Sequence, residues 1–306
     1  MITYNPKPFV KWVGGKTQLI KSIENTLPEN FSKIKDLTYI EPFVGGGAVL
    51  FWVLNNYPNI TKAIINDINP DLTTAYKTIK TNPKDLIKSL SAIQEEYIPL
   101  TEEKRKEYFL EKRSRFNTKS LDDIENTSLF IFLNRTCFNG LYRVNSKGLF
   151  NVPFGKYTNP KICDKETILA DSHILQRVEI LTGDFKETLK HADKGSLFYF
   201  DPPYKPLSNT SSFTSYSKED FNDLDQIRLG DFCKKIDELG HNFILSNSDV
   251  KECSINGNFF DDLYDSFDIQ RVLAKRSINA NADKRGKLTE LMITNFDNYR
   301  VQSIAN

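Results

Sequence analysis

Short apolar runs recur along the chain, and a cluster of polar, Gly or Pro residues ends each of them. An apolar run of about four to eight residues that is bounded in this way is typical of a buried strand. The predicted strands lie at residues 38–45, 62–69, 178–185, 196–204 and 241–248. Two later runs, at 267–274 and 289–296, are predicted to pair as a β-hairpin around a polar loop.

Helical patterns lie between some of the predicted strands. Asn69-Pro70 and Asn82-Pro83 each place a capping residue before a proline at the first helical position. Residues 221–240 form an amphipathic pattern that ends at Gly240. Strands that alternate with helices indicate an α/β fold with a mostly parallel sheet.

This alternation breaks between about residue 70 and residue 176. The first half of the region is helical and charged, and the second half is loop-like, aromatic and basic. We interpret residues 71–176 as a domain inserted between the second and third strands. Residues 1–70 and 177–306 would then form the other domain.

Charge is unevenly distributed, although the net charge is only +1. Residues 1–23 carry four Lys and no acid, and residues 135–161 carry five Lys or Arg and no acid. Residues 271–287 carry six basic residues and one acid, whereas residues 258–268 carry four Asp and no base. Each basic tract alone could be a solvated loop, but together they could form one electropositive face that binds nucleic acid.

Other features exclude several classes of protein. The four Cys are scattered without a C-x-x-C pair, and there are three His, so we expect reduced thiols and no metal site. No apolar run approaches the ~20 residues of a membrane span, and the N-terminus lacks the apolar core of a signal peptide. We therefore expect a cytoplasmic protein without a membrane partner.

Two glycine-rich segments carry candidate binding chemistry. Residues 14–17, Gly-Gly-Lys-Thr, look like the end of a phosphate-binding loop, but Val10 stands where that loop needs its first glycine. The second segment, "EPFVGGG" at 41–47, follows a strand, and Asp67 ends the next strand 20 residues after Gly47. Such glycines let a ligand approach the backbone, and an acid at this distance suits ribose hydroxyls. A nucleoside cofactor would fit, although G-x-G-x-x-G is absent; the alternative is a glycine turn with a helix-capping Asp.

The segment "DPPY" at 201–204 follows another apolar run, so it is expected at the carboxyl end of a strand. The Asp201 carboxylate and the Pro202 carbonyl could accept both hydrogens of an amino group on a planar base. The Tyr204 ring could stack on the face of that base. The alternative is a proline-rich turn without chemistry.

The ordered set "KWVGGK", "EPFVGGG", "NDIN", "FNGLYRVNSKGLFNVPFGKY", "GDF" and "DPPY" resembles the Dam-type (D12 class) DNA adenine-N6 methyltransferases. The resemblance runs from about residue 8 to residue 297. It implies an α/β, Rossmann-like S-adenosylmethionine-dependent methyltransferase sheet with a β-hairpin at its C-terminal end. It also implies an inserted, mainly helical DNA-recognition domain.

The resemblance implies transfer of a methyl group from S-adenosyl-L-methionine to a flipped-out adenine in duplex DNA, with S-adenosyl-L-homocysteine as product and no metal. GATC is the expected site; another GA-containing site such as GATATC, RNA as substrate, and an inactive DNA-binding regulator are the alternatives. The expected partner is double-stranded DNA, and the enzyme is expected to be a nucleoid-associated monomer in a prokaryote or a phage-infected cell. Genetic pairing with a restriction endonuclease is an open possibility.

The family's roles carry over to residues at matching positions. Lys16 would meet the cofactor carboxylate, Asp67 the ribose hydroxyls and Asp184 the adenine amino group. The implied cofactor-binding set is Trp12, Lys16, Phe43, Gly45, Asp67, Asp184 and Asp201. The implied catalytic set is Asp201, Pro202, Pro203 and Tyr204.

Sequence recognition would fall to the insert. Arg143 would contact the guanine next to the methylated adenine, Leu141 and Pro153 a thymine methyl, Phe138 the base stack and Asn139 a phosphate. The implied DNA-binding set is Lys11, Phe138, Asn139, Leu141, Arg143, Asn145, Pro153, Lys156 and Tyr157.

Overall fold

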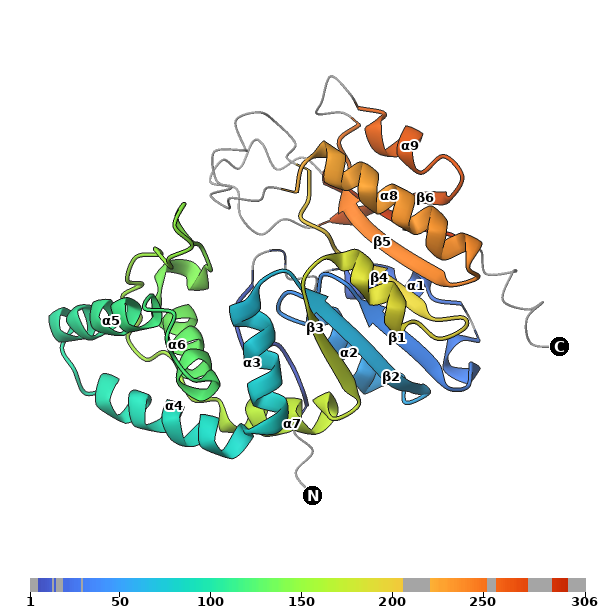
Figure 1. Cartoon of the computed structure of the whole chain (residues 1–306). Coiled ribbons are helices and arrows are strands. Elements are labelled where there is room, and N and C mark those ends of the chain that lie inside the picture. The colour runs from blue at the N-terminus through green and yellow to red at the C-terminus, as the bar shows by residue number, and fades with distance from the viewer. Residues whose placement is uncertain are drawn as a thin grey trace.

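The protein is described by a computed structural model, which defines residues 5–12, 14, 19–28, 30–205, 221–251, 257–274 and 288–296. Within these residues a seven-stranded mixed sheet runs in the order β3-β2-β1-β4-β5-β7-β6 (Figure 1). The strands are β1 (Leu37–Glu41), β2 (Ile60–Asp67), β3 (Val178–Thr182), β4 (Leu197–Phe200), β5 (Asn242–Ser248), β6 (Asp268–Ala274) and β7 (Leu288–Thr294).

Helices connect the strands and cover the sheet. They are α1 (Ile20–Thr26), α2 (Ala48–Asn56), α3 (Pro70–Thr81), α4 (Pro83–Tyr97), α5 (Glu102–Phe116), α6 (Asp123–Thr136), α7 (Lys165–Leu175), α8 (Asp223–Glu238) and α9 (Phe259–Leu263), with 3-10 turns η2 (Phe31–Lys33), η3 (Phe138–Gly140) and η4 (Phe185–His191). Among the described residues, no helix is both long and apolar enough to cross a bilayer.

The strand pairing confirms the predicted α/β sheet. Strands β1 to β5 pair in parallel, and β7 pairs antiparallel with both β5 and β6. The two runs predicted as a hairpin are thus antiparallel neighbours at the C-terminal end of the sheet. The strand order reverses between β1 and β4, because β2 and β3 lie on one side of β1 and the remaining strands on the other.

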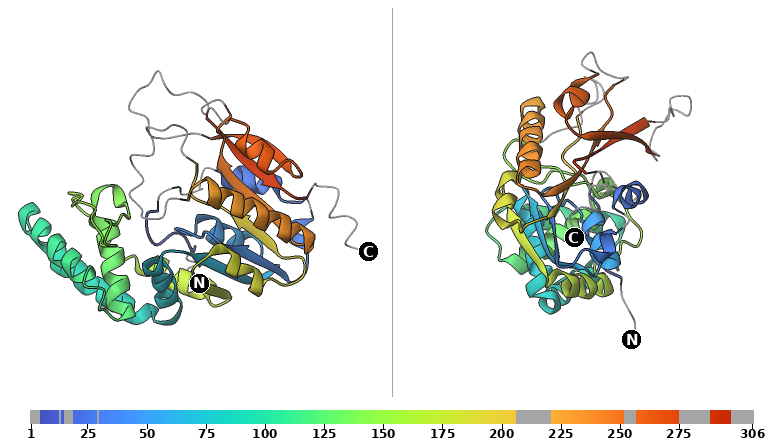
Figure 2. Two further views of the ribbon diagram at one scale, coloured as in Figure 1. Left: turned by 45° about the horizontal axis from the view of Figure 1, so that its top comes forward. Right: turned by 90° about the vertical axis from the view of Figure 1, so that its right-hand side faces the viewer.

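Alternate residues of each strand enter different cores. Tyr39, Ala63 and Tyr199 belong to a cluster that includes α2, α3 and α7, whereas Ile40, Ile64 and Phe198 belong to a cluster that includes α8 and α9. This follows from the two-residue period of a strand. Both faces are buried, which explains why the parallel strands read as nearly continuous apolar runs. Figure 2 shows helices on both sides of the sheet.

The region between β2 and β3 is mainly helical, as predicted, and α4, α5 and α6 stand out from the sheet (Figure 1). Buried aromatic rings join these helices: the Phe132 ring centroid lies 5.2 Å from that of Tyr97 and 6.4 Å from that of Phe109. Helix α3 packs on β2 and β3 as well as on α6. The insert therefore shares one hydrophobic core with the sheet, and the bounds 71–176 stay a prediction.

The two predicted helix starts differ in detail. The Asn69 side chain accepts hydrogen bonds from the backbone N–H groups of Asp71 and Leu72, so it caps α3 as predicted. Asn82 occupies the capping position of α4 but makes no side-chain cap bond. Its Oδ1 instead accepts a hydrogen bond of 2.7 Å from the Thr81 hydroxyl.

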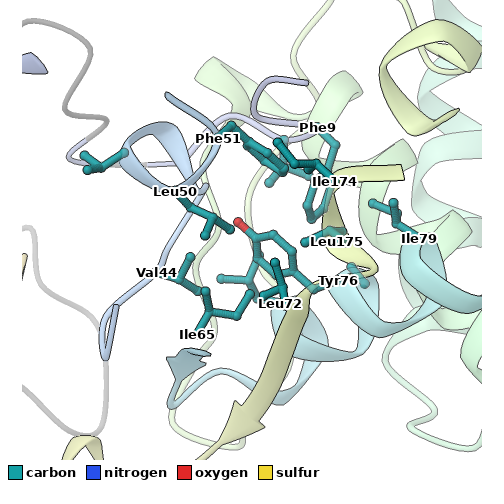
Figure 3. Close-up of a cluster of buried hydrophobic side chains, with 14 of the residues drawn as sticks. Phe9, Val44, Leu50, Phe51, Ile65, Leu72, Tyr76, Ile79, Ile174 and Leu175 are labelled. Atoms are coloured by element: carbon teal, nitrogen blue, oxygen red, sulfur yellow. The ribbon is translucent and has the colours of Figure 1, made fainter. Parts of the chain in front are cut away.

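Tyr76 of α3 connects the core to the glycine-rich turn after β1. Its ring is buried among apolar side chains of the sheet, α2 and α7 (Figure 3). Its hydroxyl donates a 3.0 Å hydrogen bond to the Gly45 carbonyl. A Cβ atom on Gly47, whose φ is +76°, would lie 2.4 Å from that hydroxyl. The turn and α3 can therefore pack this closely only with glycine at position 47.

Candidate active site

The candidate site lies along the carboxyl edge of the parallel strands. Gly45 follows β1, Asp67 ends β2, Asp184 follows β3 and Asp201 follows β4. Since neighbouring parallel strands end at the same edge, the fold brings these four predicted residues to one edge of the sheet. Open α/β sheets bind ligands at this edge, at the point where the strand order reverses. Here that point lies between Glu41 and Asp201.

Strand β5 holds the Asp201 carboxylate. The hydroxyl of Ser246, which is buried in β5, lies 3.3 Å from Asp201 Oδ1 and 3.3 Å from the Phe200 carbonyl. The Tyr199 hydroxyl lies 3.2 Å from the same Ser246 oxygen. Asp201 itself is only half-buried. The sheet therefore orients this carboxylate, and the residue as a whole stays partly exposed.

The other predicted catalytic residues differ in exposure. Pro202 is buried and Pro203 exposed, and Tyr204 is half-buried. The Tyr204 hydroxyl donates a 2.9 Å hydrogen bond to Glu290 of β7. Burial and the nearby charge of Asp201 raise the pKa of Tyr204 far above its ordinary value. The phenol therefore stays neutral at any physiological pH.

A second acid lies at the point where the strand order reverses. Glu41, the last residue of β1, is buried and accepts a 2.8 Å hydrogen bond from the Tyr39 hydroxyl. Burial raises the pKa of Glu41 well above its ordinary value, the Tyr39 bond opposes this, and the charge of Asp201 adds to it. Sequence reasoning did not select Glu41. The sequence feature that could have indicated Glu41 is an acidic residue directly after an apolar run.

Asp67 fastens the end of β2 to the glycine-rich turn. Its Oδ2 accepts a 3.0 Å hydrogen bond from the Gly45 N–H, and its Oδ1 accepts a 2.9 Å bond from the Asn69 N–H. Burial raises the pKa of Asp67, and these backbone bonds oppose the rise. Beside it, the apolar Ile68 side chain is 64% exposed, which sequence reasoning overlooked.

Trp12 connects the glycine-rich turn to the insert. A Cβ atom on Gly45 would lie 2.8 Å from the indole Cδ1, so the ring rests directly on this turn. The indole also stacks on Tyr142 of the insert, with centroids 5.5 Å apart and planes 25° apart. The Tyr142 hydroxyl in turn donates a 2.8 Å bond to Asp71 of α3. Lys16, predicted to bind the cofactor, lies outside the described residues.

Phe43 and Asp184 lie on the side of the turn that faces η4 and α8. The Phe43 ring packs 5.3 Å from Phe185 and 5.6 Å from Phe221 between centroids. Asp184 accepts a 3.0 Å bond from the Lys186 N–H and a 2.7 Å bond from the Arg228 guanidinium. Burial alone would raise the pKa of Asp184, but these two bonds outweigh it and lower the pKa. Asp184 is therefore an ionised acceptor that already takes hydrogen bonds from Lys186 and Arg228.

The predicted DNA-binding residues after α6 lie in one segment, residues 137–157, which we call the recognition loop. A hydrogen bond of 2.8 Å from the Phe138 N–H to the Pro153 carbonyl closes the loop. The backbones of Cys137 and Phe154 form an isolated antiparallel β-bridge at the same place. Phe138 is 52% exposed. Asn139, Pro153 and Lys156 are exposed too, so the ends of this loop present both apolar and polar groups to solvent.

Polar contacts within the recognition loop orient several of its side chains. Arg143 Nε donates a 2.8 Å bond to Asn151 Oδ1. Asn145 Oδ1 accepts bonds from the N–H groups of Lys147 and Leu149, so Asn145 shapes the turn that follows it. Lys156 forms a 2.7 Å ion pair with Glu102 of α5. Leu141 is half-buried against the hydrophobic cluster that includes α2, α3 and α7.

Lys11 reaches the recognition loop from the N-terminal segment. Its backbone exchanges two 2.8 Å hydrogen bonds with the Asn134 side chain of α6. Its side chain crosses Gly140, where a Cβ atom would lie 2.4 Å from Lys11 Cδ. Its ammonium lies 5.0 Å from the centroid of the Tyr157 ring, within cation–π range. The first and second basic tracts therefore meet here, whereas most of the third lies outside the described residues.

A metal site would require several acidic, thiol or imidazole side chains to converge on one point. Within the part of the chain that the structure describes, no group of three or more His, Cys, Asp or Glu is arranged to hold a metal ion.

Comparison with known proteins identifies the family. Residues 12–278 match the D12 class N6 adenine-specific DNA methyltransferase family. The chain is 50% identical to the type II methyltransferase M.MjaIII of Methanocaldococcus jannaschii over 95% of this chain and 99% of that protein. It is 41% identical to the type II methyltransferase M1.LlaDCHI of Lactococcus lactis subsp. cremoris, over 96% and 97% of the two chains.

A third relative bears a different name. The chain is 37% identical to the DNA adenine methylase of Haemophilus influenzae, over 94% of this chain and 92% of that protein. The family match covers most of the chain, and the relatives align over nearly their full lengths. The glycine-rich turn, the acidic strand ends and the Asp201–Tyr204 segment all lie within residues 12–278. The chain belongs to the D12 class N6 adenine-specific DNA methyltransferases and is an adenine-specific DNA methyltransferase.

Proposed function

We propose that this enzyme transfers the methyl group of S-adenosylmethionine to N6 of an adenine flipped out of duplex DNA, within the sequence GATC. The observation that carries the proposal is the position of Asp201–Tyr204 at the reversal of strand order, where the Ser246 hydroxyl lies 3.3 Å from Asp201 Oδ1. The finer parts, GATC and the duplex, rest on the family resemblance of the recognition loop.

The groups along the sheet edge fit S-adenosylmethionine, whose sulfonium supplies an electrophilic methyl group when bound. The Asp67 carboxylate, which already holds the Gly45 N–H, has lone pairs for ribose hydroxyls. Asp184 is an ionised acceptor suited to an adenine amino group. Phe43 and the exposed Ile68 offer apolar surface to a planar ring. Trp12 keeps the glycine-rich turn in place, and Lys16 would pair with the cofactor carboxylate.

The amine needs activation because its lone pair is delocalised into the adenine ring. The Asp201 carboxylate and the Pro202 carbonyl would accept its two hydrogens and favour a more tetrahedral, more nucleophilic nitrogen. Tyr204, whose hydroxyl is tied to Glu290 at 2.9 Å, would stack on the extruded base. Fixed placement of the reacting groups supplies much of the rate in such a transfer.

The recognition loop would read the duplex. The exposed Phe138 is suited to fill the space that the extruded base leaves, and Asn139 would contact phosphate. Arg143, oriented by Asn151, would contact a guanine, and Leu141 and Pro153 would contact a thymine methyl. Asn145, Lys156, Lys11 and Tyr157 would complete the DNA-binding surface.

Two relatives are named as type II methyltransferases, which supports a restriction endonuclease as genetic partner.

Methylation-aware sequencing tests this function. The chain is expressed in a host that lacks DNA methylation, beside an Asp201→Ala variant whose fold is checked by circular dichroism. We expect N6-methyladenine in GATC with the wild-type chain and none with Asp201→Ala. Methylation confined to another sequence would overturn GATC and leave the chemistry standing. A folded Asp201→Ala variant with near wild-type activity would overturn the active site.

A further inference from the structure

We propose that Gln226 and Asn247 form a buried relay that positions the Pro203 carbonyl, and through it the methyl-acceptor segment Asp201–Tyr204. The inference rests on the proposed function, because it takes this segment as the place of methyl transfer. Gln226 lies on α8 and Asn247 on β5, so both residues are distant in sequence from the segment they would position.

The relay is a chain of three hydrogen bonds with a fixed direction. The Ser248 N–H donates to Asn247 Oδ1 at 2.8 Å, and Asn247 Nδ2 donates to Gln226 Oε1 at 3.1 Å. Gln226 Nε2 then donates to the Pro203 carbonyl at 3.1 Å. The chain begins at a backbone donor and ends at a backbone acceptor, so each carboxamide has only one orientation that satisfies both neighbours.

Burial makes the relay costly to break. Gln226 and Asn247 are both 0% exposed, and a buried amide that loses its partner carries the full cost of desolvation. Gln226 also lies in phase with Leu229, Cys233 and Ile236 on the buried face of α8. A carboxamide at a position where the helix otherwise places apolar groups needs a specific partner, and the Pro203 carbonyl is that partner.

The relay acts with two further contacts on the same short segment. The Ser248 hydroxyl donates a 2.8 Å bond to the Lys205 carbonyl, and Glu290 accepts the bond from Tyr204. On the other side, the Ser246 hydroxyl lies against Asp201. The Pro202 carbonyl, the second proposed acceptor for the amine, therefore lies between two anchored residues. Gln226 is thus a positioning residue, since a shift of Pro203 would move that acceptor.

Gln226→Glu and Gln226→Met separate the hydrogen bond from simple packing. The carboxyl group that Gln226→Glu introduces can donate to the Pro203 carbonyl when it is protonated, whereas the side chain in Gln226→Met fills similar volume without a donor. Single-turnover methylation rates are measured for both variants between about pH 5.5 and 8.5 and divided by the wild-type rate at each pH. We expect Gln226→Met to be slower by about ten- to a hundredfold at every pH. Gln226→Glu should approach the wild-type rate as the pH falls.

The outcomes against the inference are distinct. It fails if Gln226→Met keeps the wild-type rate, or if both variants slow equally with the same pH profile. If the Gln226 variants do not fold, Asn247→Asp and Asn247→Leu give the same comparison, because the carboxyl group in Asn247→Asp can donate to Gln226 only when protonated. Asp201→Asn is measured in parallel. If Asp201→Asn kept wild-type activity, the proposed active site would be refuted. If Asp201→Asn were inactive while Gln226→Met stayed fully active, the relay alone would be refuted.

Discussion

Asp67 performs a structural task besides the ligand-binding role that its position predicts. Both of its oxygens accept backbone N–H bonds: the bond from Gly45 joins the ends of β1 and β2, and the bond from Asn69 shapes the turn that follows β2. The proposed bond to ribose would be added to these contacts. Removing the side chain would therefore disturb the glycine-rich turn as well as any ligand, and the two effects must be measured separately.

We expect Asp67→Ala to weaken S-adenosylhomocysteine binding by about ten- to a hundredfold, the usual effect of losing a hydrogen bond to a charged group. Calorimetric titration measures this. A 2′,3′-dideoxyribose analogue of the same ligand is the control, because it lacks the hydroxyls that Asp67 would bind. It should bind the wild type more weakly than S-adenosylhomocysteine does, and Asp67→Ala should lose less affinity for it than for S-adenosylhomocysteine. Equal losses for both ligands would assign Asp67 to the turn alone.

One class of site residues that sequence analysis selected lies in local motifs at or directly after the end of a strand. Asp67 and Asp201 fall into this class. Glu290, Gln226 and Asn247 were missed because their partners are far away in sequence. A signal existed, however. Asn247 lies in the polar cluster that ends the apolar run of β5, and Gln226 interrupts the apolar face of a helix. Polar groups that are buried at such positions need partners.

Hydrogen bonds hold the N-terminal segment 5–12 against the helices that lie between β2 and β3. The Lys7 N–H donates a 3.0 Å bond to Asp171 of α7, and the Arg135 guanidinium of α6 donates a 2.7 Å bond to the Phe9 carbonyl. Asp171 is completely buried, and its Oδ2 has no hydrogen-bond partner among the described residues. Burial raises the pKa of Asp171 to about 8.

This shift makes stability depend on pH in a definite direction. Between the ordinary pKa of 3.8 and the folded value of about 8, the folded chain holds more protons than the unfolded one at this residue. The contribution of Asp171 to the free energy of unfolding therefore falls as pH rises, by at most about 1.4 kcal/mol per pH unit. We expect Asp171→Asn to gain stability relative to wild type from about pH 5 to about pH 8, as measured by urea unfolding.

Asp164 is the matched control on the same side of the molecule. Burial alone would raise its pKa, but bonds from Lys161 and Thr167 outweigh burial and lower the pKa. The contribution of Asp164 to the free energy of unfolding is present above its ordinary pKa. This contribution is lost as the pH falls through the lower pKa of the folded state. Asp164→Asn should therefore lose stability at neutral pH and lose less in acid. The same pH trend in both variants would contradict this account of Asp171.

At the level of elements, apolar runs predicted every strand from β1 to β7, and their ends differ from the structure by a few residues. The sheet order could not be predicted in this way, since it depends on which strands pair in space. Nor could the cap of α4, because Thr81 takes the Asn82 oxygen that the helix N–H groups would otherwise bind. Local propensity predicts that an element exists, whereas tertiary contacts decide its neighbours.

Across the whole molecule, the acidic run neutralises part of one basic tract, whereas a lysine of another tract lies over an aromatic ring. The acidic run 258–268 supplies Asp261, which forms a 2.7 Å ion pair with Arg271 of the third basic tract. Lys11, from the first tract, lies instead over Tyr157 at the recognition loop. A net charge of +1 therefore coexists with a basic tract, residues 135–161, that contains no acid. This tract includes the recognition loop, where DNA contacts are proposed.

Arg143 within this loop could serve as a phosphate contact or as a guanine reader, and the two roles differ in sequence dependence. Its bond to Asn151 at 2.8 Å fixes the plane of the guanidinium, as a bidentate contact to a base edge requires. We expect Arg143→Ala to lose about 1–3 kcal/mol of discrimination when kcat/KM is compared on GATC and on duplexes changed at each G·C pair. Lys147→Ala, an exposed neighbour, should instead slow all duplexes equally and reduce the salt dependence. If Arg143→Ala behaved like Lys147→Ala, Arg143 would be a phosphate contact and the guanine would be read elsewhere.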